Sequence, residues 1–312
     1  AGRERTDIFI LFPHGKVSPV QQRQMTTSRA ANVHALAVEG NFDDCQGLVK
    51  GMFNNHAFRD RVALSGVNSI NWARIMAQIV YYFSSALSLG GPDQPISFTV
   101  PTGNFGDIFA GYAAKKMGLP IERLVIATND NDILARTLAD GEYRTRGVVE
   151  TTSPSMDIQV SSNFERLLFE ASGRNPAQVR RYMDGLKQGG AFTIEARELD
   201  RIRSEFDAGR ATMDETAATI RSTLSAGGYL LDPHTATAVH VAAGHAGSTP
   251  MVMLGTAHPA KFPAAVEAAS GVRPALPAWL GGLMSAEERF TVLPSDLKML
   301  EDYVSRHTRA VR

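Results

Sequence analysis

A glycine-containing run at residues 100–107 joins an apolar segment to an expected helix and could bind phosphate. Gly103 and Gly106 stand three residues apart, and glycine lets the backbone turn tightly and approach a ligand without interference from a Cβ atom. The unpaired N–H groups and the dipole of the helix start favour an anion at the same point. The spacing fits neither a Walker loop nor the dinucleotide-binding GxGxxG motif. From these residues alone, phosphate binding and a tight strand-to-helix turn capped by Asn104 are equally supported.

Polar residues form a stripe along a long helix that is otherwise apolar almost all round. Asn71, Arg74 and Gln78 are spaced by three and four residues, which places them on one helix face. A polar stripe with one arginine on a helix suited to burial must face a cavity, a partner or water. The alternative is that Asn68 or Ser69 caps the helix and that the Arg74 guanidinium is solvated.

A third group of functional side chains follows the expected strand at residues 251–254. Thr256, His258 and Lys261 place a hydroxyl, an imidazole and an ammonium group within six residues. Ligands of open α/β sheets lie beyond the carboxyl ends of the strands, so this position favours a binding role. Without further information, a helix cap at Thr256 and a surface imidazole at His258 are slightly favoured.

Composition limits the classes of function that the chain can have. Its 312 residues suggest two domains, or one large domain with insertions. Its formal net charge of zero excludes bulk attraction to nucleic acid or anionic membrane. The single cysteine, Cys45, excludes an intramolecular disulfide and a cysteine-cluster metal site, and no metal ligand set is predicted. GxSxG, P-loop, CxxC and HExxH motifs are lacking, as are a membrane-length apolar run and a signal-peptide pattern. A cytoplasmic protein is therefore expected.

The order of the expected elements predicts an α/β fold. Short apolar runs alternate with helical patterns, which indicates βαβ units and a parallel sheet covered by helices on both faces. Strands are expected at residues 8–12, 33–38, 62–64, 96–100, 124–127 and 251–254, and helices at 19–27, 42–54, 70–89, 105–117, 132–138, 235–243 and 294–307.

The middle of the chain has a different pattern. From about residue 163 to 223 the sequence is helical and densely charged, as at 196–208, and no strand is predicted there. This pattern favours an α/β cofactor-binding domain at residues 1–158 and a mainly helical subdomain at 159–230. Residues 231–312 are expected to return to the α/β domain and to end in a helical tail.

The motifs taken together resemble those of threonine synthases, which are pyridoxal-phosphate enzymes of the tryptophan-synthase-β fold. The likeness covers nearly the whole chain in one order and is weakest at residues 172–227 and in the tail. It implies a three-layer parallel-sheet fold with a helical insertion. The motifs that carry it are residues 8–18, 41–46, 68–71, 100–107, 153–158 with 162–166, 232–235 and 256–262.

The resemblance implies a role for each of the three groups of residues. Thr256 would hydrogen-bond the pyridine nitrogen of pyridoxal 5′-phosphate. A phosphate on the substrate would be bound by Asn68, Ser69 and Arg74, with Lys16 as a second cation. The cofactor phosphate would be held through the backbone amides of Gly103, Asn104, Phe105, Gly106 and Asp107.

The implied reaction converts O-phospho-L-homoserine and water to L-threonine and phosphate, the last step of threonine biosynthesis. The substrate is thus a small molecule, and neither nucleic acid nor a membrane is an expected partner. A related phospho-lyase or dehydratase that uses pyridoxal phosphate is the alternative enzyme. A non-catalytic module that binds a phosphate ligand is the alternative from another class.

The sequence departs from the family pattern at its start. In the family, the Schiff-base lysine precedes a Ser-Gly-Asp-Thr-Gly loop, and neither segment occurs in this chain. The chain is therefore expected to be the C-terminal portion of a longer enzyme, to lack a catalytic lysine of its own and to be inactive alone. Its expected partner is the missing N-terminal segment. The lysines that lack the required context are Lys16, Lys50, Lys115, Lys116, Lys187, Lys261 and Lys298.

Overall fold

The computed structural model describes residues 1–67, 69–245 and 247–310 of the chain. The chain divides into two compact units. The first consists of Ala1–Gly66 and Ala275–Arg312, and the second of Val67–Pro274. The domain boundaries predicted after residues 158 and 230 stay predictions. None of the helices in the described residues is long and apolar enough to cross a membrane.

The first unit contains a small parallel sheet in the order β1-β2-β9. Leu36 and Val38 of its central strand pack against Cys45, Leu48 and neighbouring helical residues in a buried cluster. The elements of this unit are β1 (Ile8–Pro13), α1 (Pro19–Thr26), β2 (Val33–Glu39), α2 (Phe42–Asn54), α3 (His56–Arg61), η3 (Ala278–Leu280), η4 (Leu283–Ser285), β9 (Thr291–Pro294) and α13 (Leu297–His307).

The strand predicted at residues 62–64 is wrong. Val62 ends helix α3, and its N–H group bonds the carbonyl oxygens of Phe58 and Asp60. Ala63 then adopts a left-handed conformation with φ of 48°, which turns the backbone out of an extended path. A short apolar run therefore ends a helix here and does not join the sheet.

The second unit is built on a parallel sheet in the order β7-β4-β3-β8. The central strands β3 and β4 are almost entirely buried, as expected for a sheet covered on both faces. The two remaining strands of this unit, β5 and β6, form an antiparallel pair. The strands are β3 (Ile96–Pro101), β4 (Ile121–Thr128), β5 (Glu142–Arg144), β6 (Ala191–Thr193), β7 (Phe206–Arg210) and β8 (Met251–Met253).

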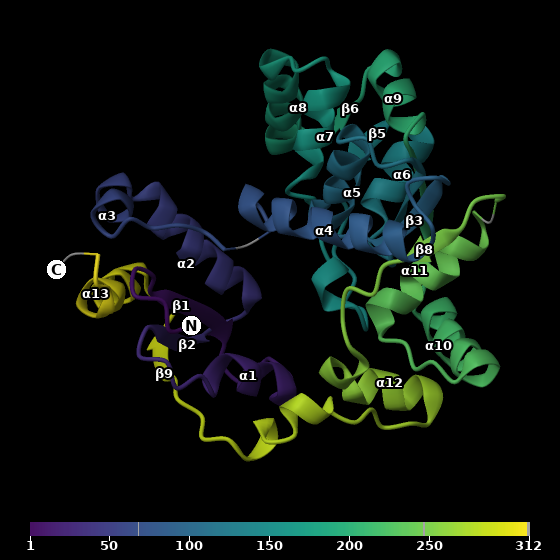
Figure 1. Ribbon diagram of the computed structural model, residues 1–312. Helices are drawn as coiled ribbons and strands as arrows, with labels where there is room; N and C mark the ends of the chain where they lie inside the picture. The colour runs from purple at the N-terminus through teal and green to yellow at the C-terminus, as the bar shows by residue number, and fades with distance from the viewer. Residues whose placement is uncertain (68, 246, 311–312) are drawn as a thin grey trace. The chain divides into compact units, whose positions relative to one another are not determined.

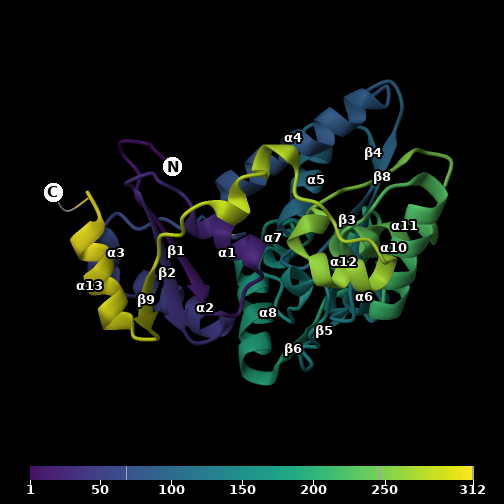
Figure 2. The ribbon, with the colours of Figure 1, turned by 90° about the horizontal axis from the view of Figure 1, so that it is seen from below.

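Helices cover both faces of this sheet, so the unit has the predicted three-layer α/β arrangement. Helix α11 packs along the strands on one face, with α10 and α12 beside it, and α4, α5 and α6 lie on the other side (Figures 1 and 2). The helices are α4 (Trp72–Ser88), α5 (Gly106–Lys116), α6 (Ile133–Asp140), η1 (Pro154–Met156), α7 (Phe164–Ala171), α8 (Pro176–Gly189), α9 (Ala196–Arg203), α10 (Met213–Gly227), α11 (Pro233–Ala243), η2 (Pro259–Lys261) and α12 (Pro263–Ser270).

The prediction that residues 163–223 contain no strand is wrong. The helical pattern at 196–208 continues only to Arg203, and β7 pairs with β4 in parallel at the edge of the main sheet. Gly209 in β7 allows α11 to pack closely, because a Cβ atom there would lie 2.6 Å from Val241. Pairing and packing override the weak strand propensity of this segment.

Candidate functional site

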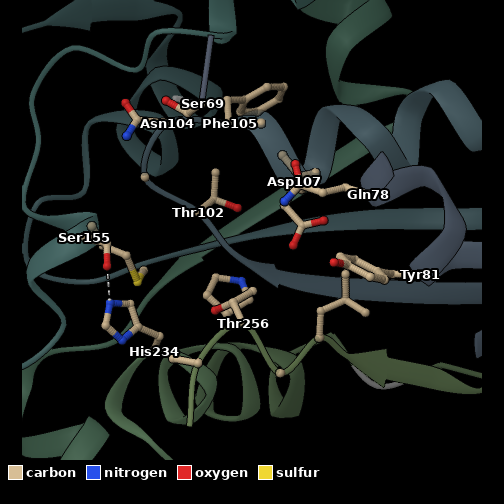
Figure 3. Close-up of a pocket in the computed structure, with 18 of the residues that line it drawn as sticks. Ser69, Gln78, Tyr81, Thr102, Asn104, Phe105, Asp107, Ser155, His234 and Thr256 are labelled. Atoms are coloured by element: carbon tan, nitrogen blue, oxygen red, sulfur yellow. Dashed lines mark hydrogen bonds between the residues drawn. The ribbon is translucent and has the colours of Figure 1, made fainter. Parts of the chain in front are cut away.

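A pocket of about 580 Å³ lies in the second unit, beyond the carboxyl ends of β3 and β8. Its lining comes from the start of α5, from α4, from the turn around η1, from the start of α11 and from the loop after β8 (Figure 3). This edge of a parallel sheet is where α/β proteins bind their ligands. Three predicted groups of residues, at 102–107, 69–78 and 254–262, therefore meet in one cavity.

The loop before α5 leaves the helix start open to a ligand. Phe105 occupies the N-cap position in a left-handed conformation with φ of 63°, and no side chain caps the helix. Capping by Asn104, the alternative reading of this run, is therefore wrong. A non-glycine residue in this conformation is uncommon and costs energy unless its surroundings hold it. The uncapped amides give the pocket an anion-binding character.

Core packing holds Phe105 in that conformation. The Phe105 side chain is 1% exposed, and its ring centroid lies 5.4 Å from that of Phe164 and 5.8 Å from that of Phe206. Phe206 belongs to β7, the strand that the sequence did not predict. The main core of the unit thus fixes the backbone that forms one side of the pocket.

Gly103 is required by a close approach of two backbone segments. A Cβ atom at this position would lie 2.8 Å from the carbonyl oxygen of Ser155 and 3.1 Å from Cα of Met156. Neither backbone atom can rotate away as the end of a side chain could. The loop and the turn around η1 are therefore packed backbone to backbone.

The carboxyl group of Asp107 lies in the first turn of α5 and is partly buried. The hydroxyl group of Tyr82 donates to the backbone oxygen of Asp107 at 2.8 Å and lies 3.4 Å from Oδ1. Burial raises the pKa of Asp107 to about 6, although the Tyr82 hydroxyl and the Arg74 charge act in the opposite direction. The carboxyl group of Asp107 therefore changes its charge near pH 6.

The polar stripe on α4 reaches the pocket in part. Arg74 and Gln78 line the pocket together with Ser69, and Arg74 is exposed to solvent there. Asn71 instead caps the helix, because its side chain accepts from the N–H group of Ala73 at 2.8 Å. The helix consequently begins at Trp72 and not at residue 70. Asn68, a predicted substrate ligand, lies outside the described residues.

Thr256 and Lys261 line the opposite side of the pocket. Thr256 is exposed within the loop that follows β8, so its hydroxyl group is open to a ligand (Figure 3). His258 caps η2 by accepting at Nδ1 from the N–H group of Ala260, which fits a structural role. Lys16 lies in the turn after β1 in the first unit, where its N–H group bonds Pro13.

Sequence reasoning assigned no role to a serine and a histidine that line the pocket. Ser155 Oγ and His234 Nε2 share a hydrogen bond of 2.9 Å (Figure 3). Nδ1 of His234 lies 3.4 Å from Asp232 Oδ1 without hydrogen-bond alignment. Burial alone would raise the pKa of Asp232, but the neighbouring His234 and Thr235 lower it. The sequence signal for this position was the Asp-Pro pair at the start of α11, because an aspartate before a proline predicts a helix N-terminus. That signal would have placed His234 in the first turn of the helix.

The pocket combines two kinds of group that could bind an anion with a hydroxyl group. Backbone amides at 103–107 can hold one phosphate, and the guanidinium of Arg74 can hold a second anion by charge-assisted hydrogen bonds. Within the described residues, no three His, Cys, Asp or Glu side chains form a group that could hold a metal ion. The arrangement suits a phosphorylated cofactor and a phosphorylated substrate bound side by side.

Comparison with known proteins agrees with this chemistry. The family model described as "Pyridoxal-phosphate dependent enzyme" matches residues 6–254, and the one described as "Threonine synthase, C-terminal" matches residues 235–304. Threonine synthase of Pseudomonas aeruginosa is 52% identical over 307 residues, which cover 97% of this chain and 66% of that protein.

Solved structures give the same result. The structure of pyridoxal-phosphate-bound threonine synthase from Brucella melitensis is 70% identical, with a TM-score of 0.95, over 99% of this chain and 67% of that one. Yeast threonine synthase is 39% identical, with a TM-score of 0.88, over 98% of this chain and 65% of that one. The chain spans about two thirds or less of the length of the curated relatives it matches. It belongs to the pyridoxal-phosphate dependent enzyme family and, within that family, to the threonine synthases.

Proposed function

We propose that this chain supplies the phosphate-binding part of the active site of a threonine synthase. The reaction converts O-phospho-L-homoserine and water to L-threonine and phosphate. One observation carries the proposal: a single pocket contains an uncapped helix start, the Arg74 side chain and the Thr256 hydroxyl group. The family resemblance supports the identity of the substrate. A cytoplasmic location stays a prediction from composition.

The residues present fit pyridoxal 5′-phosphate. The amides at the start of α5 would bind its phosphate, since no side chain occupies them and Gly103 leaves no Cβ in the turn. Thr256 would donate or accept a hydrogen bond at the pyridine nitrogen, as a neutral partner. When bound, the cofactor supplies the electron sink of the reaction, and the protein supplies orientation.

Arg74 would bind the phosphate of the substrate. Its planar guanidinium group can donate two parallel hydrogen bonds to one phosphate, which fixes the orientation as well as the charge. Ser69 and Gln78 lie beside it in the pocket lining and can donate further hydrogen bonds. The roles predicted for Lys16 and Asn68 stay predictions.

The lysine that moves protons in this family has no assigned counterpart among the seven lysines of this chain. Lys261 is the lysine that lines the described pocket, and its Nζ lies 5.9 Å from the ring centroid of Phe262. We place Lys261 beside the ligand and not in covalent bond to it, because its segment matches a different family motif. The chain alone should therefore bind ligands without turnover.

Binding by the purified chain tests the proposal. Pyridoxine 5′-phosphate, which lacks the aldehyde and so cannot react with surface lysines, should bind more tightly than pyridoxine by calorimetry. O-phospho-L-homoserine should likewise bind more tightly than L-homoserine. Equal affinity for the phosphorylated and unphosphorylated member of each pair would refute the proposed phosphate-binding function.

Covalent labelling tests the assignment of the lysine. The chain is mixed with pyridoxal phosphate and borohydride, and peptides are mapped by mass spectrometry. We expect no lysine to be labelled stoichiometrically, and stoichiometric labelling of Lys261 would contradict the assignment. In a longer protein that contains this chain, phosphate released together with threonine supports the synthase, whereas phosphate released with a 2-keto acid supports the alternative lyase.

A further inference from the structure

The segment at residues 161–166 contacts both anion-binding loops of the pocket, although the sequence assigned it no role. It follows the turn around η1 and includes the first turn of α7, which begins at Phe164. Ser161 Oγ donates to the carbonyl oxygen of Gly103 at 2.7 Å, and Ser162 Oγ donates to Oδ1 of Asn104 at 3.2 Å. Ser162 Oγ also lies 3.5 Å from Ser69 Oγ. These contacts place the segment behind the pocket wall.

Asn163 joins the two loops through a single amide group. Its Nδ2 atom donates to the carbonyl oxygen of Ser69 at 2.9 Å and to that of Asn104 at 2.9 Å. The backbone N–H of Asn163 also donates to Asn104 at 3.1 Å. The side chain is 0% exposed, so water cannot replace either bond. One buried donor group thus contacts both the cofactor loop, residues 103–107, and the substrate loop, which contains Ser69 and leads into α4.

Arg166 fixes the orientation of this amide. Its Nε atom donates to Oδ1 of Asn163 at 3.0 Å, which determines which end of the amide carries the donors. Its Nη2 atom donates to the carbonyl oxygen of Ile70 at 2.8 Å, beside the substrate loop. A Cβ atom at Gly106 would lie 3.4 Å from Asn163 Nδ2, so the start of α5 packs directly on the amide.

This geometry makes the positions of the two loops interdependent. If either loop moves away, the Asn163 amide and a backbone carbonyl lose a buried hydrogen bond, which costs about 1–3 kcal/mol. A ligand that holds one loop in place therefore lowers the cost of ordering the other. Such coupling is reciprocal and equals the ratio of affinities with and without the other ligand.

We propose that Asn163 is a positioning residue that couples the two anion sites, so that a bound phosphate at one loop strengthens phosphate binding at the other. The inference rests on the proposed function, because it assumes one phosphate at residues 103–107 and another at Ser69 and Arg74. Coupling of this kind amounts to about tenfold in affinity. It would favour substrate binding to the cofactor-loaded pocket.

The test measures, by calorimetry on the 312-residue chain, the affinity for each ligand with and without the other ligand bound. Pyridoxine 5′-phosphate is titrated into the chain alone and into the chain saturated with O-phospho-L-homoserine, and the order is then reversed. The wild-type chain should show about tenfold tighter binding in each loaded state, by the same factor in both orders. Asn163→Ala should reduce that factor to about one.

Asn131→Ala is the matched control. Asn131 is also buried and donates from Nδ2 to a backbone carbonyl, that of Val149 at 2.8 Å, but it lies outside the pocket lining. It should lose stability as Asn163→Ala does and keep the coupling factor. Arg166→Met, at a less buried position, provides a second variant that should lower the factor if Asn163→Ala does not fold.

The outcomes separate the two proposals. If the wild-type chain binds neither ligand, the proposed function fails and the coupling fails with it. If the wild-type chain binds both ligands with a factor of one, the coupling is refuted and the proposed function stands. A factor that stays near tenfold in Asn163→Ala and in Arg166→Met also refutes the role of Asn163. A factor lost in these variants and kept in Asn131→Ala supports it.

Discussion

The two anion-binding loops of the pocket are built from different parts of the chain. At residues 103–107 the proposed binding groups are backbone amides, and the side chains of this loop mainly fix the backbone. At residues 69–78 the proposed binding groups are side chains, above all that of Arg74 on helix α4. Anion binding at residues 103–107 should therefore depend on the packing of the core. Anion binding at residues 69–78 should depend mainly on one charged side chain.

This difference predicts how each loop responds to substitution. Changes in packing should damage the backbone loop and the stability of the fold together. Removal of Arg74 should damage ligand binding and leave the fold intact, because its side chain is exposed. Substitutions at residues 103–107 should therefore change stability and binding together, whereas substitution of Arg74 should change binding alone.

The largest effect is expected for Phe105→Ala. The ring is 1% exposed and packs between Phe164 and Phe206, so its removal should cost about 3–5 kcal/mol of unfolding free energy. Urea denaturation measures this loss. Val80→Ala, at a position that is 62% exposed, should change stability by less than about 0.5 kcal/mol. A similar small change for Phe105→Ala would show that the core does not hold the loop.

A smaller loss of stability, together with a loss of binding, is expected for Gly103→Ala. The new Cβ would clash with backbone at 2.8 Å, which should cost about 1–3 kcal/mol and weaken pyridoxine 5′-phosphate binding by about tenfold or more. Gly227→Ala is the control, since no atom lies within 4 Å of its added Cβ. The explanation fails if both variants bind the ligand as the wild-type chain does.

Arg74→Ala should weaken O-phospho-L-homoserine binding by about 10- to 100-fold, the value of a charge-assisted hydrogen bond. The melting temperature should stay within a degree or two of wild type, because the side chain is exposed. Arg180→Ala, on the exposed surface of α8, should alter neither quantity. Unchanged affinity in Arg74→Ala would remove Arg74 from the substrate site.

The smallest effect is expected for Asp107→Asn. Because burial raises the pKa of Asp107 to about 6, the native state holds its proton more tightly than the unfolded chain. The rise of this pKa to about 6 is worth at most about 3 kcal/mol, and solvent screening of this partly buried side chain reduces the expected effect to about 1 kcal/mol. The wild-type chain should therefore lose about 1 kcal/mol of stability as the pH rises from about 4 to 6, and level off above about pH 7. Asp107→Asn should lack this loss. Parallel pH profiles for the two proteins in urea denaturation would contradict the assignment.

Much of this site could be predicted from sequence, because its signals are local. The expected segments at 8–12, 33–38, 96–100 and 124–127 lie within β1, β2, β3 and β4, and the helix expected at 42–54 is α2. The loops beyond these elements could then be found from their glycines and charged residues. Local spacing also indicated the stripe with Arg74, whereas for Thr256 it slightly favoured a helix cap, and only the family resemblance implied a ligand role for its hydroxyl group.

The remainder depends on contacts between distant residues. β7 contains Asp207, Gly209 and Arg210, which favour no strand, and only pairing with β4 makes it one. The left-handed conformation of Phe105 is stabilised by Phe164 and Phe206, which are far from it in the sequence. The amide of Asn163 likewise contacts two segments that are distant from it in sequence. No local spacing pattern could therefore predict its position.

The most direct test of the two-loop account is a crossed titration of Gly103→Ala and Arg74→Ala with each ligand alone. We predict that Gly103→Ala loses about tenfold or more in affinity for pyridoxine 5′-phosphate and several-fold less for O-phospho-L-homoserine, and that Arg74→Ala shows the reverse. If both variants lose affinity for the same ligand, or if either loses both equally, the pocket does not contain two separate phosphate sites.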